Sequence, residues 1–159
     1  MIRDIIKSGL IVLILIALQL TLIPLVSIKG IIPDLVVIYI VIYAMRNGQV
    51  KGTFFGFVVG LFFDLFSGGL LGSAMFAKTL AGFVAGYFHK DDEEDIFSNS
   101  LLFASIIFIA SLIDSFFYAF LGSAEVELNI LSLIFMNGIF PAAYTSLIGL
   151  AYSLLVRKK

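Results

Sequence analysis

Apolar segments separated by short polar turns take up nearly the whole chain. They cover residues 8–26, 31–45, 52–66, 73–88, 96–121 and 128–156. Of the 159 residues, 61% are hydrophobic and 13% are charged, whereas a soluble domain is about half apolar and about a quarter charged. We therefore predict an all-α integral membrane protein, with six transmembrane helices that form a single transmembrane domain over residues 1–159.

Three of these segments are short for membrane spans. The segments 31–45, 52–66 and 73–88 fall below the roughly 20 residues that a straight span needs. Two interpretations stay open, namely three full spans whose polar flanks lie among the lipid headgroups, or a re-entrant pair. We favour three full spans. The first segment has the positive start of a signal peptide, but it is long and no small-residue cleavage pattern follows it, so we expect a retained helix.

Small residues recur at every fourth position in the middle of the chain. The glycines concerned are Gly52, Gly56, Gly60, Gly68, Gly72, Gly82 and Gly86. Residues four apart lie on one side of a helix, and in lipid such small residues let two helix backbones approach closely. We predict a helix-packing ridge. It serves either as the internal contact between the third and fourth spans or as a docking face for a partner.

An aspartate and a lysine accompany this ridge. Asp64 lies before the turn that joins the third and fourth spans, and Lys78 lies after it. In an antiparallel hairpin their depths differ by two residues of helical rise, or about 3 Å. The spacing predicts an intramembrane ion pair. Ionisable side chains are costly in a membrane and default to functional candidates, although a ridge of this kind often serves packing alone.

Other polar groups in the apolar segments lack an obvious internal partner. They are Asp34, Asp114 and Asn137, and we predict that they contact a partner within the membrane. Pro33-Asp34 has the form of a helix start, because a carboxylate there is favoured by the helix dipole. Asn137-Gly138 and Pro141 predict a break in the last span, since proline removes a helical hydrogen bond.

The basic residues are distributed unevenly over the turns. With six spans, one side of the membrane holds eight cations, Arg3, Lys7, Arg46, Lys51, Lys90, Arg157, Lys158 and Lys159, and the other holds Lys29. The positive-inside rule predicts that both termini are cytoplasmic. Asp34, Asp64, Lys78 and Asp114 then lie in the outer half of the membrane. The acidic run at 90–95 reads as a solvated loop that leads into a helix, or as a docking site for a basic partner.

Motifs of known chemistry are missing from the sequence. There is no cysteine, no Walker loop, no HExxH pair, no histidine cluster and no nucleophile elbow. An intramembrane aspartyl protease needs two aspartates that share a proton, and Asp64 is predicted to pair with Lys78 instead. We expect no catalysis, no metal site, no cofactor and no nucleic-acid partner.

The motifs of the first four spans resemble a known family. Pro33-Asp34-Leu35, the turn Arg46-Asn47-Gly48, and the glycine series from Gly52 through Asp64 to Gly72 are similar to the bacterial rod shape-determining protein MreD. The resemblance covers residues 33–86 in motif and nearly the whole chain in layout. It implies a scaffold of the cell-elongation (rod) complex in the inner membrane, involved in peptidoglycan synthesis and cell shape. The implied partner is MreC, which has one membrane helix and an external domain. MreB, RodA and a class B penicillin-binding transpeptidase are further associates, and a homodimer is an alternative assembly.

The same resemblance also implies a rival function. The MreD family is similar in fold to the substrate-binding (S) subunits of energy-coupling-factor transporters. Those subunits usually carry small residues four apart on their first helix, where this chain has only Ala17 and Thr21. A scaffold is expected to satisfy its outer polar groups by internal pairing or with a partner helix. A transporter subunit is expected to leave an outward pocket of several hundred Å3.

Overall fold

The computed structural model describes residues 2–89, 99–122 and 130–157, which are mainly helical. The helices are α1 (Ile2–Thr21), α2 (Leu35–Asn47), α3 (Gln49–Ser67), α4 (Ser73–Gly86), α6 (Ser100–Gly122), α7 (Ile130–Ile134) and α8 (Phe140–Arg157). A 3-10 helix, η1 (Ile23–Val26), follows α1, and a π-helical turn, η2 (Phe135–Ile139), joins α7 to α8. No β-strand occurs within these ranges. The acidic run at 90–95 and the two terminal lysines fall outside the described residues.

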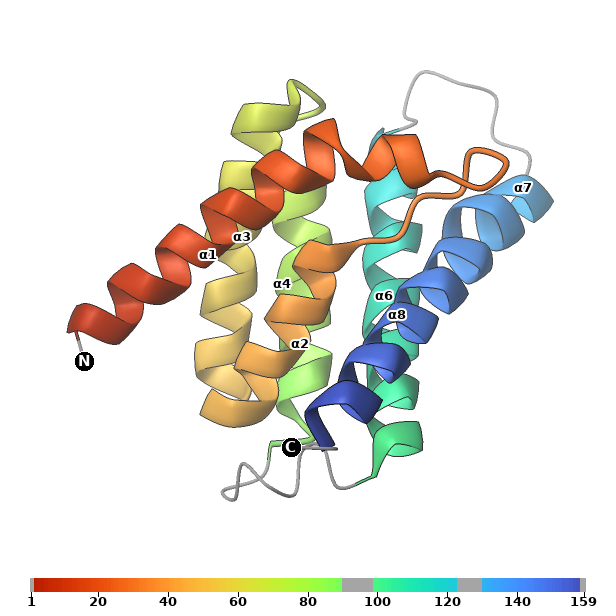
Figure 1. Cartoon of the computed structure of the whole chain (residues 1–159). Coiled ribbons are helices and arrows are strands. Elements are labelled where there is room, and N and C mark those ends of the chain that lie inside the picture. Colours follow the sequence, from red (N-terminus) through yellow and green to blue (C-terminus); the bar gives the residue numbers. More distant parts are fainter. Residues whose placement is uncertain (1, 90–98, 123–129, 158–159) are drawn as a thin grey trace.

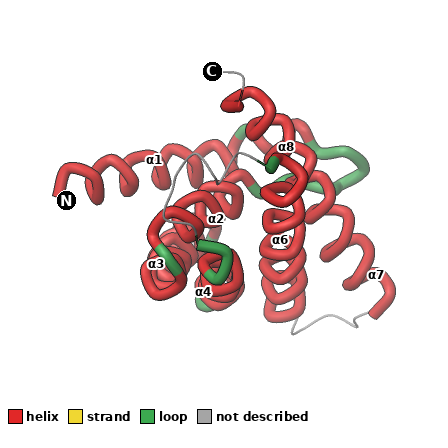
Figure 2. The backbone as a smooth tube through the Cα atoms, turned by 90° about the horizontal axis from the view of Figure 1, so that it is seen from below, coloured by secondary structure: helices red, strands yellow, loops and turns green. Residues whose placement is uncertain are grey.

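Helix α2 lies at the centre of the bundle. Seen from below, α1, α3, α4, α6 and α8 surround it (Figure 2). Its apolar residues are buried on every side, and they include Val36, Val37, Ile40, Val41 and Met45. A helix that is apolar all round is stable only when other helices cover it. The sequence Leu35–Met45, which has no charged residue, meets that condition.

Helix α2 is also short and begins inside the bundle. Its 13 residues span about 20 Å, and it starts part-way down from the upper end of α3 and α4 (Figure 1). A tight turn at Lys29 and Gly30, which have φ values of 53° and 82°, precedes the descent to Asp34. The predicted second span, 31–45, therefore starts with extended backbone and becomes helical only at Leu35.

The α3–α4 hairpin is packed backbone against backbone. A Cβ atom added to Gly60 would lie 2.5 Å from the carbonyl oxygen of Ala74, and one added to Gly56 would clash with the carbonyl of Lys78. Gly82 faces Gly52 in the same way, and Gly86 faces Gln49. These glycines thus form the internal contact between two helices, where any larger residue would push the backbones apart.

Two glycines of the predicted ridge have a different role. Gly68 and Gly72 lie in the turn between α3 and α4, with φ values of 67° and 106°, and a Cβ on either would meet nothing within 4 Å. Their assignment to the helix-packing ridge was therefore wrong. The every-fourth spacing continues through them by coincidence, because a reversal of the chain needs residues that tolerate positive φ.

The predicted break in the last span is a π-helical turn. Pro141 has no N–H to give to the carbonyl of Asn137, four residues earlier, so the regular ladder cannot continue there. The chain instead widens over Phe135–Ile139, where the N–H of Phe140 donates to the carbonyl of Phe135. Such a turn keeps the helix continuous, and α7, η2 and α8 form one long rod beside α6 (Figure 1).

The outer surface is that of a membrane protein. Three helical stretches in the described ranges are long and apolar enough to cross a membrane: Gln49–Ser67, Ser100–Gly122 and Ile130–Val156. Large apolar side chains, among them Phe54, Leu101 and Leu147, are exposed on their outer faces. In a soluble protein so much apolar surface would mark a binding or aggregation site, whereas here it faces lipid.

Candidate functional site

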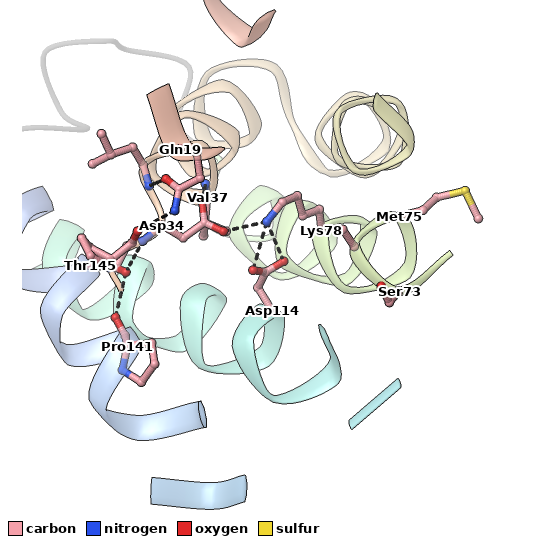
Figure 3. Close-up of polar contacts among 12 residues, drawn as sticks. Gln19, Asp34, Val37, Ser73, Met75, Lys78, Asp114, Pro141 and Thr145 are labelled. Carbon is pink, nitrogen blue, oxygen red and sulfur yellow. Dashed lines mark hydrogen bonds and ion pairs between the residues drawn. The ribbon is translucent and has the colours of Figure 1, made fainter. Parts of the chain in front are cut away.

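Three charged side chains from three helices meet inside the bundle (Figure 3). The Lys78 ammonium, on α4, donates to Asp34 Oδ2 at 2.7 Å and to the two carboxylate oxygens of Asp114, on α6, at 3.1 and 3.3 Å. The Lys78 nitrogen also lies 4.9 Å from the centre of the Phe63 ring, within the range of a cation–π contact. We call Asp34, Lys78 and Asp114 the ion cluster.

Asp34 holds the start of α2 in place. It is the N-cap residue of that helix, and its Oδ1 accepts the N–H of Val37 at 3.0 Å, which satisfies one of the free donors at the helix start. Its own N–H donates to Thr145 Oγ1, on α8, at 2.9 Å. Asp34 therefore links the central helix to its neighbours through both its side chain and its backbone.

Gln19, on α1, completes the network (Figure 3). Its amide nitrogen donates to the carbonyl of Pro33 at 2.7 Å, and its amide oxygen accepts the N–H of Leu35 at 3.0 Å. Non-helical backbone inside a membrane protein must find such partners within the protein. Through Gln19, Asp34, Lys78, Asp114 and Thr145, five helices are tied together near one point.

The predicted ion pair between Asp64 and Lys78 is not formed. Asp64, near the end of α3, instead binds the start of α4. Its Oδ2 accepts the N–H groups of Gly72 and Met75 at 2.8 and 3.0 Å, and its Oδ1 accepts the N–H of Ala74 at 3.0 Å. The carboxylate acts as a helix cap supplied by the neighbouring helix.

The free donors of α4 explain why the prediction was wrong. A helix start leaves several N–H groups unsatisfied, and they attract a carboxylate. The N-cap position of α4 is Gly72, which has no side chain to satisfy them, so Asp64 takes that role. The backbone of Lys78 lies against Gly56 of α3, while its side chain extends to Asp34 and Asp114 on α2 and α6.

The predicted partner contacts also need correction. Asp34 and Asp114 were expected to lack internal partners, but both bind Lys78, with exposed side-chain fractions of 17% and 4%. Asn137 alone of the three is exposed, and its side chain makes no hydrogen bond to any described residue. The sequence indicates the depth of a side chain in the membrane, but it does not indicate the direction in which the side chain leaves its helix.

An open cavity of about 570 Å3 lies at the upper end of the bundle. The connections 22–34 and 68–72, the last two turns of α6, and η2 surround it. Its polar lining consists of Gln19, Asp34, Ser73, Asp114, Ser115, Tyr118 and Asn137. The apolar lining includes Ile32, Phe63, Leu70 and Met136. The outer polar groups are therefore internally paired, as expected of a scaffold. They also lie next to a ligand-sized space, as expected of a transporter subunit.

The cluster offers binding chemistry. An ammonium lies between Asp34 and Asp114 in place of the shared proton of an aspartyl protease pair. No group of three metal-ligating side chains occurs within the residues that the structure describes. What the geometry provides is a fixed junction of helices and two carboxylates at the base of a cavity.

Two members of the network were not predicted as site residues. Gln19 is the only strongly polar side chain in the first apolar segment, which is a usable signal, because a lone amide in a membrane helix seeks a hydrogen-bond partner. Thr145 gives no such signal. Its hydroxyl donates to the carbonyl of Pro141 at 2.8 Å, as an ordinary helical threonine does.

Comparison with known proteins gives one family. The profile of the family described as rod shape-determining protein MreD matches residues 5–156. Searches of curated proteins and of solved structures found no significant match. The match includes Gln19, the ion cluster, the α3–α4 hairpin, Asn137 and Thr145.

Proposed function

This chain belongs to the MreD family of rod shape-determining proteins, and from that membership we propose that it is a membrane scaffold of the cell-elongation (rod) complex. Membership gives it a role in determining rod shape. In our proposal it carries out that role by binding MreC and helping to position peptidoglycan synthesis. The single observation that supports this function is the family match over residues 5–156.

The distribution of polar groups favours a protein that acts by binding. The buried charges hold helices together, and the outward face of the bundle is mainly apolar. Among the described residues, nothing resembles an activated nucleophile with its base. We therefore propose recognition of other membrane proteins, without catalysis.

An apolar groove on the outer face of the hairpin is our candidate seat for the MreC membrane helix. It has a volume of about 440 Å3 and is lined by Gln49, Val50, Thr53, Phe54, Phe57, Thr79 and Phe83. Helix pairs in lipid associate through shape and small residues, and the lining of this groove combines two threonines with three bulky aromatic side chains. The groove replaces Asp34 and Asp114 as the proposed contact surface.

The proposed location is the bacterial inner membrane, with several spans and both termini in the cytoplasm. Support comes from the charge bias of eight cations against one and from the three long apolar stretches. MreB, RodA and a class B penicillin-binding transpeptidase are proposed as further associates, and a second copy of this chain is the alternative partner. Reporter fusions at Lys159 are expected to give a cytoplasmic signal, and an external signal would overturn this orientation.

Affinity purification from the native membrane tests the function. The tagged chain is expected to recover MreC after mild detergent extraction. A matched variant, Phe57→Ala with Phe83→Ala, removes two aromatic side chains of the groove and is expected to keep the fold and lose MreC. If the wild-type chain recovers no member of the rod complex, the proposed function is wrong.

Photo-crosslinking locates the surface. Probes at Phe57 and Thr79 lie in the groove, and probes at Leu101 and Leu147 lie on exposed faces of α6 and α8. We expect MreC crosslinks from the first two positions. Crosslinks from the α6 and α8 probes alone would leave the function in place and reject the groove.

The cavity favours a second candidate function, the substrate-binding subunit of an energy-coupling-factor transporter. Its volume of about 570 Å3 lies within the roughly 300–1,000 Å3 of small-molecule sites. Against this candidate, α1 offers only Ala17 and Thr21 as small residues four apart. Recovery of a coupling ATPase in place of MreC in the same purification would favour transport.

A further inference from the structure

We propose that the cavity at the upper end of the bundle binds the ammonium group of an amphipathic organic cation. The inference concerns the isolated chain and stands whether or not MreC binds elsewhere. It begins from the arrangement of charges around the cavity. Asp34 and Asp114 line it, whereas Lys78, with 2% of its side chain exposed, lies behind them and does not.

The charges of the ion cluster do not balance. Two carboxylates share one ammonium, so its formal charge is −1 when all three groups are ionised. No lysine or arginine of the described residues lines the cavity. The excess is carried on the side that a ligand reaches, and an unpaired charge within a membrane protein is strongly unfavourable. A bound cation removes that imbalance.

Asp114 has room for another donor. Among the described residues, its two oxygens accept hydrogen bonds only from Lys78, although a carboxylate has about four lone-pair sites. Asp34 is more occupied, because its oxygens accept from Val37 and from Lys78. The ammonium of a ligand is therefore expected to bind mainly to Asp114, on the side of that carboxylate away from Lys78.

The cavity walls suit the rest of such a molecule. Phe63 and Tyr118 line it with their rings edge to face, 6.1 Å apart between centres, and aromatic faces attract cations. The side chains of Ser115, Tyr118 and Asn137 form no hydrogen bond with any described residue, which leaves them available to a ligand. The π-helical turn contributes Asn137 to this lining, and such turns are frequent at functional sites.

Two sources can supply this chemistry. A free amine can enter from the aqueous side, because the cavity is open, or an ammonium-bearing phospholipid headgroup can enter from the adjacent leaflet. Both place an ammonium at Asp114 and an apolar body against Phe63 and Leu70. The test below separates them by changing the lipid while keeping the soluble probe constant.

The test uses three probes of one shape and different charge. Phenethylamine, 2-phenylethanol and phenylacetate are titrated against the full chain in phosphatidylglycerol nanodiscs, and thermal unfolding is followed. Since a ligand that binds only the folded state raises the unfolding midpoint, phenethylamine is expected to give a saturable rise. The alcohol and the acid are expected to give none. Equal shifts for the amine and the alcohol would show that charge plays no part and would overturn the proposal.

Two variants locate the site. Asp114→Asn leaves a balanced pair of Asp34 and Lys78 and is expected to weaken phenethylamine binding by about tenfold or more. Ser115→Lys, next to Asp114 on the cavity wall, supplies an internal ammonium and is expected to abolish the response. Ser67→Lys, at the same end of the bundle but outside the cavity, is the matched control and is expected to behave as wild type. Wild-type amine binding by folded Asp114→Asn and Ser115→Lys proteins would refute the site.

A change of lipid identifies the source. In nanodiscs that contain phosphatidylethanolamine, a lipid ligand is expected to raise the starting midpoint, to suppress the phenethylamine shift, and to remain bound in native mass spectrometry of the wild type but not of Ser115→Lys. An unchanged phenethylamine shift identifies a free amine as the ligand. Either result supports ammonium recognition.

Discussion

Between α3 and α4, backbone meets backbone at Gly56 and Gly60, where even a single added Cβ atom would clash. Between α2, α4 and α6, long side chains converge, and Lys78 joins Asp34 to Asp114 beneath an open cavity. The first region is closed and has no room for change. The second region has an open cavity, an unbalanced charge and hydrogen-bonding groups that are not used.

The contrast separates two kinds of stability in one small bundle. The hairpin depends on shape, so its stability is expected to be insensitive to charge but to fail when volume is added. The ion cluster depends on compensation, so it is expected to tolerate changes of volume but to fail when one charge is removed. The following substitutions test that division, from the largest expected effect to the smallest.

Removing the ammonium is expected to have the largest effect. Lys78→Met keeps much of the side-chain volume and leaves Asp34 and Asp114 buried without a cation. We expect a loss of about 3–5 kcal/mol in the free energy of unfolding, measured by SDS titration in mixed micelles. The exposed Lys51→Met is the control, with a change within about 0.5 kcal/mol. The triple variant with Asp34→Asn and Asp114→Asn is expected to recover much of the loss, and no recovery would mean that volume matters more than charge here.

Adding volume to the hairpin comes next. Gly60→Leu forces side-chain atoms into the backbone of Ala74 and Met75, and we expect a loss of about 2–3 kcal/mol in the same assay. Gly9→Leu, in α1, is the matched control, because a Cβ there meets nothing within 4 Å. If both variants unfold alike, the close approach of α3 and α4 contributes no stability and the contrast between the two regions fails.

The cap at the start of α4 is expected to have a smaller effect. Asp64→Ala removes the acceptor for three N–H groups, with an expected loss of about 1–2 kcal/mol; Asp64→Asn, which keeps one oxygen, is expected to lose less. The decisive measurement is the double variant with Lys78→Met. Because Asp64 and Lys78 do not bind each other, their effects are expected to add within about 0.5 kcal/mol. Strong coupling between the two substitutions would instead indicate that Asp64 and Lys78 interact directly, which would contradict the structure.

The turn between α3 and α4 is expected to show the smallest effect. Gly72 has a φ of 106°, a conformation that a side chain disfavours, so Gly72→Ala is expected to destabilise the protein by about 1 kcal/mol. Gly122→Ala, which has open space and an ordinary helical φ, is the control. An equal response of the two glycines would show that the turn relaxes freely and that Gly72 has no conformational role.

The sequence allowed prediction of the helices but not of which charges meet. Apolar run length located the main helices of the described ranges, and Pro33-Asp34 correctly marked the start of α2. The all-α membrane class and the family followed from the same patterns. These features are local, since each depends on residues close together in the chain.

The ion cluster depends on contacts that are distant in sequence. Lys78 is 44 residues from Asp34 and 36 from Asp114, and only the packing of α2, α4 and α6 brings them together. The error at Asp64 arose because its partners are backbone N–H groups. Residue types in the sequence do not show which N–H groups a carboxylate binds. The cavity was also beyond prediction, because it depends on where α2 begins within the bundle.

The wide separation of the cluster along the chain also fixes an order during synthesis. At about 5–20 residues per second, roughly 2–9 seconds pass between the translation of Asp34 and that of Lys78, which lies 44 residues later. Asp34 thus leaves the ribosome well before its counter-ion exists, and Asp114 follows only after Lys78. A nascent chain that ends beyond α4 has a balanced pair, and the arrival of α6 brings the second carboxylate. The ion pair that binds the start of the central helix can therefore form only after the fourth helix has been made.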